Sequence, residues 1–479
     1  MLGKLMRLGC VMMFTFAAAV YGQQNHRLIY DQLLRPVDAE FYHVAIGLCE
    51  DYPEETTTLE IIRNDMELLK RGGINLLRIS FGWDGIETAK NEYDWLFWDD
   101  YVRMAVDEYH ITLIPYICYT PQWNSTGDST NFWDHTPIDY GEFGQFVEDI
   151  VNRYKDRIKS WELWNEPDIT AYWSGTVAEY AKLFKIGAAA VRKADPEATI
   201  VLGGLAHKPE FTLALFRDLG VSEFVDVVNI HNYNETWGGN PQEMIVPYVN
   251  TIYDIIKNHG DNQSLWMAEV GYSTFRKDAH VSDHYQAYYD YEHTPKYQAV
   301  ALIRTLTLLL STNKLAAIAW YEIKDLPPME KVIGDVNNRN LGVAFVDYKP
   351  KPAEHALSFF NKLFSEKNRG IDDKVVIKRN KQSDSEVHVF EFENGDAIVI
   401  GWLKTHQPEK RGPDKSGNAK DARKETVSVE LPMKLTKATL YDELGSASDF
   451  KSVKVKNDKT IVENMRLVGG EIAIIKVSK

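Results

Sequence analysis

The chain has 479 residues with 69 acidic against 54 basic side chains, so its net charge at neutral pH is −15. Loss of the leader described below, which holds Lys4 and Arg7, lowers the charge by two further units, to −17. Nucleic acid and acidic membrane surfaces repel so acidic a chain, which argues against both as partners.

The first 22 residues have the pattern of a secretory signal peptide. Lys4 and Arg7 come first, an apolar run reaches Val20, and the small residue Gly22 follows. This is the pattern of a cleaved signal and not of a membrane span. Cys10 lies in a Leu-Gly-Cys sequence, but the apolar run follows this cysteine instead of preceding it, so we expect ordinary cleavage without a lipid anchor. The predicted location is secreted or periplasmic.

Apolar strand-like runs then alternate with amphipathic helical stretches as far as residue 367. Residues 58–71 and 177–194 show helical spacing, and the second stretch leads into the helix stop Asp195-Pro196. This βα rhythm is typical of α/β folds, and eight units favour a (β/α)8 TIM barrel over residues 23–367. The strands are predicted at 42–48, 75–80, 112–117, 160–165, 199–204, 225–231, 265–270 and 316–321.

Polar and aromatic side chains gather at the carboxyl ends of these strands. In a parallel barrel those ends share one face, where catalytic residues lie, so one pocket is expected to receive them. In strand order they include Arg78, Trp123, Asn165, Glu166, His207, His231, Tyr233, Glu269, Trp320 and Tyr321.

Glu166 ends the fourth strand in the sequence K-S-W-E-L-W-N-E-P-D, residues 159–168. Pro167 stops the strand and biases Glu166 toward an extended backbone, which holds the carboxylate on a stiff element. Glu-Pro after a strand is also compatible with an ordinary solvent-facing turn. Asn165 directly before it and two nearby tryptophans favour a catalytic acid instead.

Glu269 has the same setting in S-L-W-M-A-E-V-G-Y-S, residues 264–273. It ends the seventh predicted strand, with Gly271 and Tyr272 just beyond. The two glutamates are far apart in sequence, so only a fold that unites distant strand ends pairs them. A parallel barrel does this.

These motifs together resemble the clan A retaining glycoside hydrolases, most closely family 39 and its relatives. W-N-E-P closes the fourth strand, Glu the seventh, an H-x-Y element the sixth and Trp the eighth, and the resemblance covers residues 38–365. The resemblance implies these roles: Glu166 as general acid/base, Glu269 as nucleophile, Asn165 on the sugar's 2-hydroxyl, Tyr233 orienting Glu269, Arg78 beside Glu269 and Trp320 as the floor under the sugar.

Retaining chemistry predicts two carboxyl groups roughly 5 to 5.5 Å apart, one protonated and one ionised. We expect apolar neighbours such as Trp161, Trp164 and Trp320 to keep Glu166 protonated, and Arg78 to keep Glu269 ionised.

The aromatic content agrees with a carbohydrate substrate, because flat sugar faces stack on aromatic rings. The chain has 12 Trp and 25 Tyr, and ordinary barrel packing explains many of them equally well. Trp123 and Trp237 lie just beyond strand ends and are predicted to contact substrate, together with His207 and His231.

Metals and nucleotide cofactors have no support in the sequence. His280 and His284 share an H-x-x-x-H spacing without an evident third ligand, and no phosphate-binding glycine motif is present. We therefore predict no metal and no cofactor. Cys49 and Cys118 follow the first and third strands and are expected to be buried free thiols.

Residues 368–479 are predicted to form a small C-terminal antiparallel β-sandwich. Seven alternating segments and the turn Asn394-Gly395 support it, and the charged run 404–424 is predicted to be a solvated loop. Packing against the barrel is the simpler role for this domain, with sugar binding as the alternative.

Two functions remain from the sequence. One is a secreted retaining glycosidase that cleaves β-glycosidic bonds of a plant, algal or microbial polysaccharide or oligosaccharide. The other is a non-catalytic carbohydrate-binding barrel or scaffold, since a fold does not guarantee chemistry. The presence of both glutamates favours the enzyme. Exo or endo action and the oligomeric state stay open.

Overall fold

The computed structural model describes residue 30 and residues 32–35, 39–52, 57–276, 285–327, 336–405 and 417–479. The predicted leader, with Cys10, the pair His280 and His284, and the middle of the charged run 404–424 lie outside the described residues. Within the described residues, no helix is both long and apolar enough to cross a membrane.

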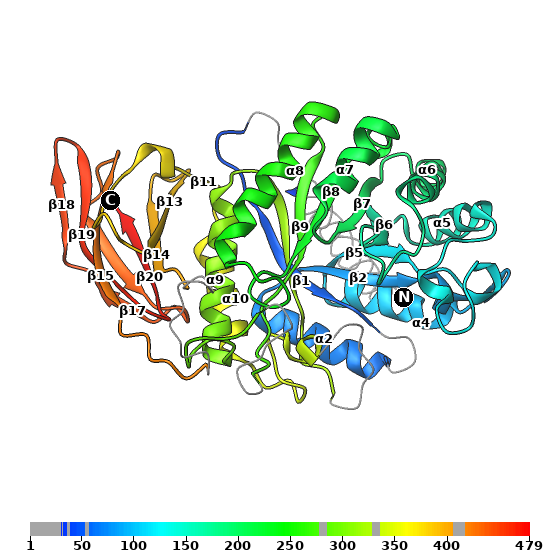
Figure 1. Ribbon diagram of the computed structural model, residues 1–479, viewed down its shortest axis with the longest axis horizontal. Coiled ribbons are helices and arrows are strands. Elements are labelled where there is room, and N and C mark those ends of the chain that lie inside the picture. The colour runs from blue at the N-terminus through cyan, green and yellow to red at the C-terminus, as the bar shows by residue number, and fades with distance from the viewer. Residues whose placement is uncertain are drawn as a thin grey trace, which may run out of the picture.

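Eight parallel strands close into a barrel (Figure 1). β1 pairs with β2 on one side and with β10 on the other, which completes the ring. The predicted TIM barrel is confirmed. The first strand begins three residues later than expected, and the other seven lie close to their predicted positions. The strands are β1 (Ala45–Glu50), β2 (Leu76–Gly82), β5 (Thr112–Cys118), β6 (Ser160–Asn165), β7 (Thr199–Leu205), β8 (Val227–Asn232), β9 (Ser264–Val270) and β10 (Leu315–Tyr321).

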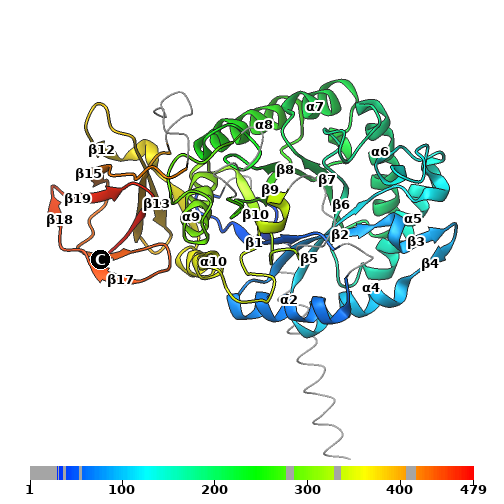
Figure 2. The ribbon, with the colours of Figure 1, turned by 60° about the horizontal axis from the view of Figure 1, so that its bottom comes forward.

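Helices surround the barrel, as Figure 2 shows. The long ones have clear end signals: a Thr176–Glu179 capping box begins α6, and Gly73 in the left-handed conformation ends α2. A short hairpin, β3 (Glu87–Ala89) with β4 (Glu92–Tyr93), follows β2. The α-helices are α2 (Leu59–Gly72), α3 (Trp83–Ile86), α4 (Trp95–Val102), α5 (Tyr140–Tyr154), α6 (Val177–Ala194), α7 (Pro209–Leu213), α8 (Ile245–His259), α9 (Pro295–Ser311) and α10 (Pro352–Leu363).

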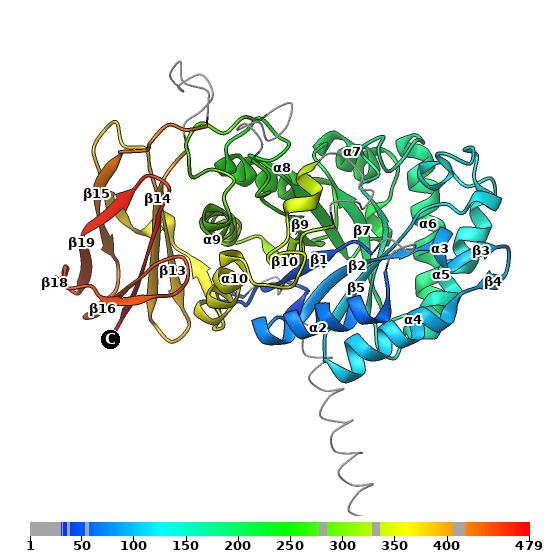
Figure 3. The same ribbon diagram turned by 90° about the horizontal axis from the view of Figure 1, so that it is seen from below.

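The sandwich packs beside α9 and α10 in every view (Figures 1 and 3). α9 is buried over most of its surface because it has the barrel on one side and the sandwich on the other. The predicted antiparallel domain is confirmed, although the short strands β11, β17 and β18 were not foreseen. One sheet has the order β11-β13-β14-β20-β16-β17 and the other β12-β15-β19-β18.

The bounds of the sandwich strands show how short many of them are. They are β11 (Asn368–Gly370), β12 (Val376–Lys378), β13 (Ser385–Phe392), β14 (Ala397–Leu403), β15 (Lys424–Leu431), β16 (Lys437–Tyr441), β17 (Ala447–Asp449), β18 (Val453–Lys456), β19 (Lys459–Val468) and β20 (Ile472–Ser478).

Barrel side chains sort into two layers by strand alternation. Ala317, Ala319 and Tyr321 of β10 face the barrel interior, while Ile318 and Trp320 face the helices. Cys49 and Cys118 are buried thiols that form no disulfide, as predicted.

Candidate active site

A cavity of about 760 Å³ opens at the carboxyl ends of the barrel strands. This is the face where catalytic groups of TIM barrels lie. Its walls come from the strand ends and from the connection between β8 and α8. They include Asp51, Glu166, Tyr172, His207, Asn232, Tyr233, Trp237, Tyr248, Glu269 and Tyr321.

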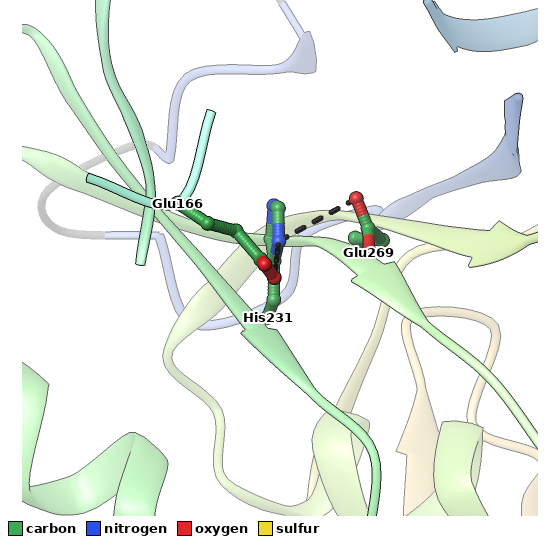
Figure 4. Close-up of side chains that lie close together, drawn as sticks. All are labelled: Glu166, His231 and Glu269. Atoms are coloured by element: carbon green, nitrogen blue, oxygen red, sulfur yellow. Dashed lines mark hydrogen bonds and ion pairs between the residues drawn. The ribbon is translucent and has the colours of Figure 1, made fainter. Parts of the chain in front are cut away.

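Glu166 and Glu269 face each other in this cavity with His231 between them (Figure 4). One carboxylate oxygen of each glutamate and one nitrogen of His231 all lie within 4.8 Å of one another. His231 Nδ1 is 2.9 Å from Glu166 Oε1 and 3.5 Å from Glu269 Oε2. The two glutamates therefore approach the same small volume from different strands.

The hydrogen-bond network fixes which nitrogen of His231 carries the proton. The Ala268 N–H donates to Asn229 Oδ1 at 2.9 Å, so the Asn229 amide nitrogen faces His231 Nε2, 3.4 Å away. Nε2 therefore accepts, and Nδ1–H donates to Glu166. Burial and the Arg78 charge hold the pKa of His231 well below its usual value, which keeps the ring neutral.

Gly204 on β7 makes room for this histidine. A Cβ atom at position 204 would lie 1.9 Å from His231 Nε2. The Gly204 carbonyl also accepts from the Glu166 N–H at 2.8 Å.

Glu269 has two strong partners. The Tyr233 hydroxyl donates to Glu269 Oε1 at 2.7 Å, and Arg78 Nη1 donates to Oε2 at 2.9 Å. Arg78 is itself fully buried and donates two bonds to Glu162, at 2.8 and 2.9 Å, and one to Asn165 at 2.8 Å. One guanidinium thus orders three side chains from β6 and β9.

The two carboxyl groups have different acidities for a physical reason. Burial raises the pKa of Glu166 well above its usual value, and the negative charges of Glu269 and Asp168 raise it further. Burial also raises the pKa of Glu269, but Arg78 and the Tyr233 hydroxyl oppose it, which leaves a value of about 7. Glu166 is therefore the group that keeps a proton. Tryptophan neighbours were expected to raise its pKa, and the negative charges of neighbouring carboxylates contribute to that rise.

The backbone around Glu166 differs from the sequence expectation. Glu166 has φ +44° and Trp164 has φ +83°, so Glu166 is not extended and the prediction from Pro167 is wrong. Asp168 explains how the turn is held, because its carboxylate accepts three successive backbone N–H groups from Ala206 to Lys208 at 2.8 to 3.0 Å. Such unusual φ values in bulky residues are characteristic of functional sites.

Most predicted site residues come together here, and two do not. Tyr233, Trp237 and His207 line the cavity, with Arg78 and Asn165 just beneath it. Trp320 is fully buried on the helix-facing side of β10, so it does not form the floor; Tyr321, the next residue, faces the cavity instead.

Trp123 is the second exception. It packs at right angles to Trp83, with ring centroids 6.1 Å apart, and donates its indole N–H to the Glu87 carbonyl at 2.9 Å. It is not among the residues that line the cavity.

Sequence reasoning missed three residues of the site: Glu162, Asn229 and Asp51. Glu162 and Asn229 lie in the middle of apolar strands, and a polar side chain there needs a buried partner, which was a usable signal. Asp51 lines the cavity and accepts hydrogen bonds from the hydroxyls of Tyr116 and Tyr321. Tyr321 was expected in the pocket together with Trp320, and strand register decided that of these two only Tyr321 lines it.

Among the described residues, one group of metal-ligating side chains lies close enough together to share a metal ion: Glu166, His231 and Glu269. Each already has a protein partner, and Arg78 occupies one side of Glu269 with positive charge. The absence of a metal stays a prediction.

A TIM barrel whose two facing glutamates lie this close has the geometry of a retaining glycoside hydrolase, because inverting enzymes hold their carboxyl groups about 6.5 to 9.5 Å apart to admit a water. The model of the glycosyl hydrolases family 39 matches residues 29–382. The chain belongs to this family, as its resemblance indicated.

Curated relatives match over a short stretch. A beta-xylosidase of Caldicellulosiruptor saccharolyticus is 34% identical over 107 residues, which span 20% of this chain and 22% of the relative. A beta-xylosidase of Geobacillus stearothermophilus is 30% identical over 121 residues, 22% and 24% of the two chains. The matched stretch thus spans less than a quarter of either relative.

Solved structures share the fold over nearly the whole chain. A family 39 glycoside hydrolase from Bacteroides cellulosilyticus WH2 has a TM-score of 0.66 at 17% identity, with 91% of this chain and 81% of that one covered. A monomeric beta-xylosidase from Caulobacter crescentus CB15 has a TM-score of 0.59 at 16% identity, with 91% and 96% covered.

Proposed function

We propose that the protein is a secreted retaining glycosidase that hydrolyses β-glycosidic bonds, with Glu269 as nucleophile and Glu166 as general acid/base. The observation that carries this proposal is the pairing of the two glutamates across His231. Arg78 and Tyr233 both donate hydrogen bonds to Glu269, whereas Arg78 donates none to Glu166. The pair is thereby divided into an ionised and a protonated carboxyl group.

In the first step, a Glu269 oxygen attacks the anomeric carbon while the Glu166 proton passes to the leaving oxygen and the glycosidic bond breaks. His231 Nδ1–H donates to Glu166 Oε1, so the acid's proton belongs on Oε2. In the second step, ionised Glu166 takes a proton from water, the water oxygen attacks the same carbon, and the bond to Glu269 breaks. The sugar is released with its original configuration.

The charges of the cavity support a neutral sugar. Asp51 and Glu269 line it beside the protonated Glu166, and a carboxylated or sulfated sugar would meet the two carboxylates Asp51 and Glu269. Asp51 suits hydroxyl recognition, because its oxygens already accept from two tyrosine hydroxyls. With the beta-xylosidase names of the curated relatives, this favours a β-xyloside or a related neutral glycoside from an oligosaccharide or polysaccharide.

The test is hydrolysis of matched aryl β-glycosides that differ only in the sugar: xyloside, glucoside, galactoside, mannoside and glucuronide. We expect one neutral glycoside to be hydrolysed far faster than the glucuronide, with the first product retaining the β configuration by NMR. A folded protein that binds sugars and hydrolyses no glycoside would establish the non-catalytic carbohydrate-binding alternative. Amino-terminal sequencing of the exported protein tests secretion, and we expect a start near residue 23.

A further inference from the structure

The connection between β8 and α8, residues 233–244, forms one wall of the catalytic cavity. Tyr233, Trp237 and Met244 all line the cavity. The Tyr233 and Trp237 rings pack edge to face with centroids 4.6 Å apart, and the Tyr233 hydroxyl binds Glu269. The position of this loop therefore decides where the hydroxyl that holds Glu269 lies.

The other face of the same loop is buried against the sandwich. Glu235 is 1% exposed, and its Oε1 accepts from the Thr405 hydroxyl at 2.8 Å. Glu243 Oε1 accepts from the indole N–H of Trp402 at 2.9 Å. Trp402 belongs to β14 of the sandwich, and Thr405 lies just beyond the end of that strand. Two sandwich side chains thus bond two carboxylates of a loop that lines the cavity.

Arg304 of α9 completes this contact from the barrel side. Its Nη2 lies 2.9 Å from Glu243 Oε1 and 3.6 Å from Glu235 Oε1, and the side chain is almost fully buried. Buried carboxylates need both a counter-charge and hydrogen-bond donors. Arg304 provides the charge, while Trp402 and Thr405 provide further donors.

A turn in the backbone of the β8–α8 loop sends neighbouring side chains to opposite sides, one toward the cavity and one toward the sandwich. Glu235 has φ +59°, a left-handed conformation that is uncommon for a residue with a side chain. Tyr233 and Asn234 consequently reach the cavity while Glu235 is held at the sandwich. A turn of this kind persists where the surrounding contacts hold it in place.

We propose that Trp402 and Thr405 are positioning residues of the catalytic site, through which the sandwich holds the β8–α8 loop and so keeps Tyr233 on Glu269. This inference rests on the proposed function for the role of Glu269. A second contact acts on the loop after β9, where Asp290 N–H donates to the Ala419 carbonyl at 3.1 Å and the Tyr291 hydroxyl to Asp421 at 3.1 Å. The sandwich is then part of the catalytic unit.

The test uses Trp402→Phe and Thr405→Val in the full chain, each of which removes one donor and keeps most of the shape. Because Tyr233 lowers the pKa of Glu269, we expect the acidic limb of the kcat/KM profile to move to higher pH and kcat to fall about tenfold, with KM little changed. When Trp402→Phe or Thr405→Val is combined with Tyr233→Phe, kcat should be no lower than in Tyr233→Phe alone, because the loop acts through the Tyr233 hydroxyl.

Asn313→Gly is the matched control. Asn313 exchanges two hydrogen bonds with Gly370 across the same barrel–sandwich junction, at 3.0 and 2.7 Å, and precedes β10 at the end of the barrel away from the cavity. Its φ of +54° suits glycine. We expect this variant to melt at a lower temperature with an unchanged pH profile.

Hydrogen exchange of the backbone amides in residues 233–244 gives a readout that does not need activity. We expect faster exchange there in Trp402→Phe and Thr405→Val and no change in Asn313→Gly. Unchanged exchange together with an unmoved acidic limb would overturn the positioning role. A wild-type protein that hydrolyses no glycoside would instead overturn the proposed function, and the exchange measurement would still decide whether the sandwich holds the loop.

Discussion

The barrel and the sandwich each bury a histidine beside carboxyl groups, and the two histidines have opposite charge states. Burial and Arg78 hold the pKa of His231 well below its usual value. Burial alone would also lower the pKa of His388, but its hydrogen bond to Asp372 and its ion pair with Glu386 outweigh that effect and raise the pKa to about 9. His388 Nδ1 is 2.7 Å from Asp372 Oδ2, and Nε2 is 3.4 Å from Glu386 Oε1.

The difference shows what the buried arginine contributes to the barrel. Arg78 supplies the positive charge there, so His231 stays neutral and donates one directed hydrogen bond to Glu166. In the sandwich the histidine provides a positive charge between two carboxylates, and Lys404 adds a second one on Glu386. The first arrangement controls a proton at a reacting group, while the second stabilises a fold, and the following experiments separate the two.

The largest expected effect comes from the barrel pair. Glu269→Gln keeps the size and the hydrogen-bonding capacity of the side chain but removes the nucleophile. We expect turnover to fall by a factor on the order of 10⁴ or more, with an unchanged far-ultraviolet circular dichroism spectrum. Near-normal turnover in the folded variant would remove Glu269 from the mechanism.

Glu166→Ala tests the proton donor. An activated aryl glycoside needs no acid to leave, but the second step still needs a base. We expect a fast burst of aryl alcohol followed by turnover slower by roughly 10² to 10⁴. Azide should restore turnover and give a glycosyl azide of retained configuration. No rescue, or an inverted azide, would contradict the acid/base role.

Gly204→Ala tests whether the place of His231 matters to catalysis. The new Cβ would overlap His231 Nε2, so the ring has to move away from its bond to Glu166. We expect kcat/KM to fall roughly 10²-fold, as for other displacements of about 1 Å. Gly144→Ala is the control, because its Cβ meets only Ile186 between α5 and α6. Equal activity losses in both variants would count against a specific role of His231.

Tyr233→Phe sharpens the assignment of charges. Glu269 acts as a carboxylate with a pKa of about 7, so kcat/KM should decline as the pH falls below that value. The Tyr233 hydroxyl lowers this pKa, and its removal should move the acidic limb upward by roughly one pH unit. A limb that stays in place would mean that a different group controls it.

The smallest effect is expected for His388→Gln, measured as the free energy of unfolding against pH. The folded pKa of His388, about 9, exceeds that of an unfolded histidine, so its stabilisation is complete below about pH 6.5 and disappears as the pH rises through 9. At pH 6 the free energy of unfolding of the wild type should exceed that of the variant by on the order of 2 kcal/mol. At pH 10 the gap should be much smaller; a constant gap would show that His388 is not charged.

The sequence by itself determined the barrel, the sandwich and the two glutamates. Strand and helix periodicities are local properties, and a strand end marked by Asn165-Glu166-Pro167 is visible within ten residues. The family resemblance placed Arg78 and Tyr233 beside Glu269, where the structure has them.

Only the tertiary structure decided which side chains face inward and which distant groups meet. The register between β8 and β9 shifts between Asn229 and His231. Trp320 is buried, whereas its immediate neighbour Tyr321 lines the cavity. Arg78 meets partners 84 and 191 residues away in the chain. The bond between Trp402 and Glu243 spans 159 residues. Such pairs depend on how the strands and domains are packed together, which no local pattern encodes.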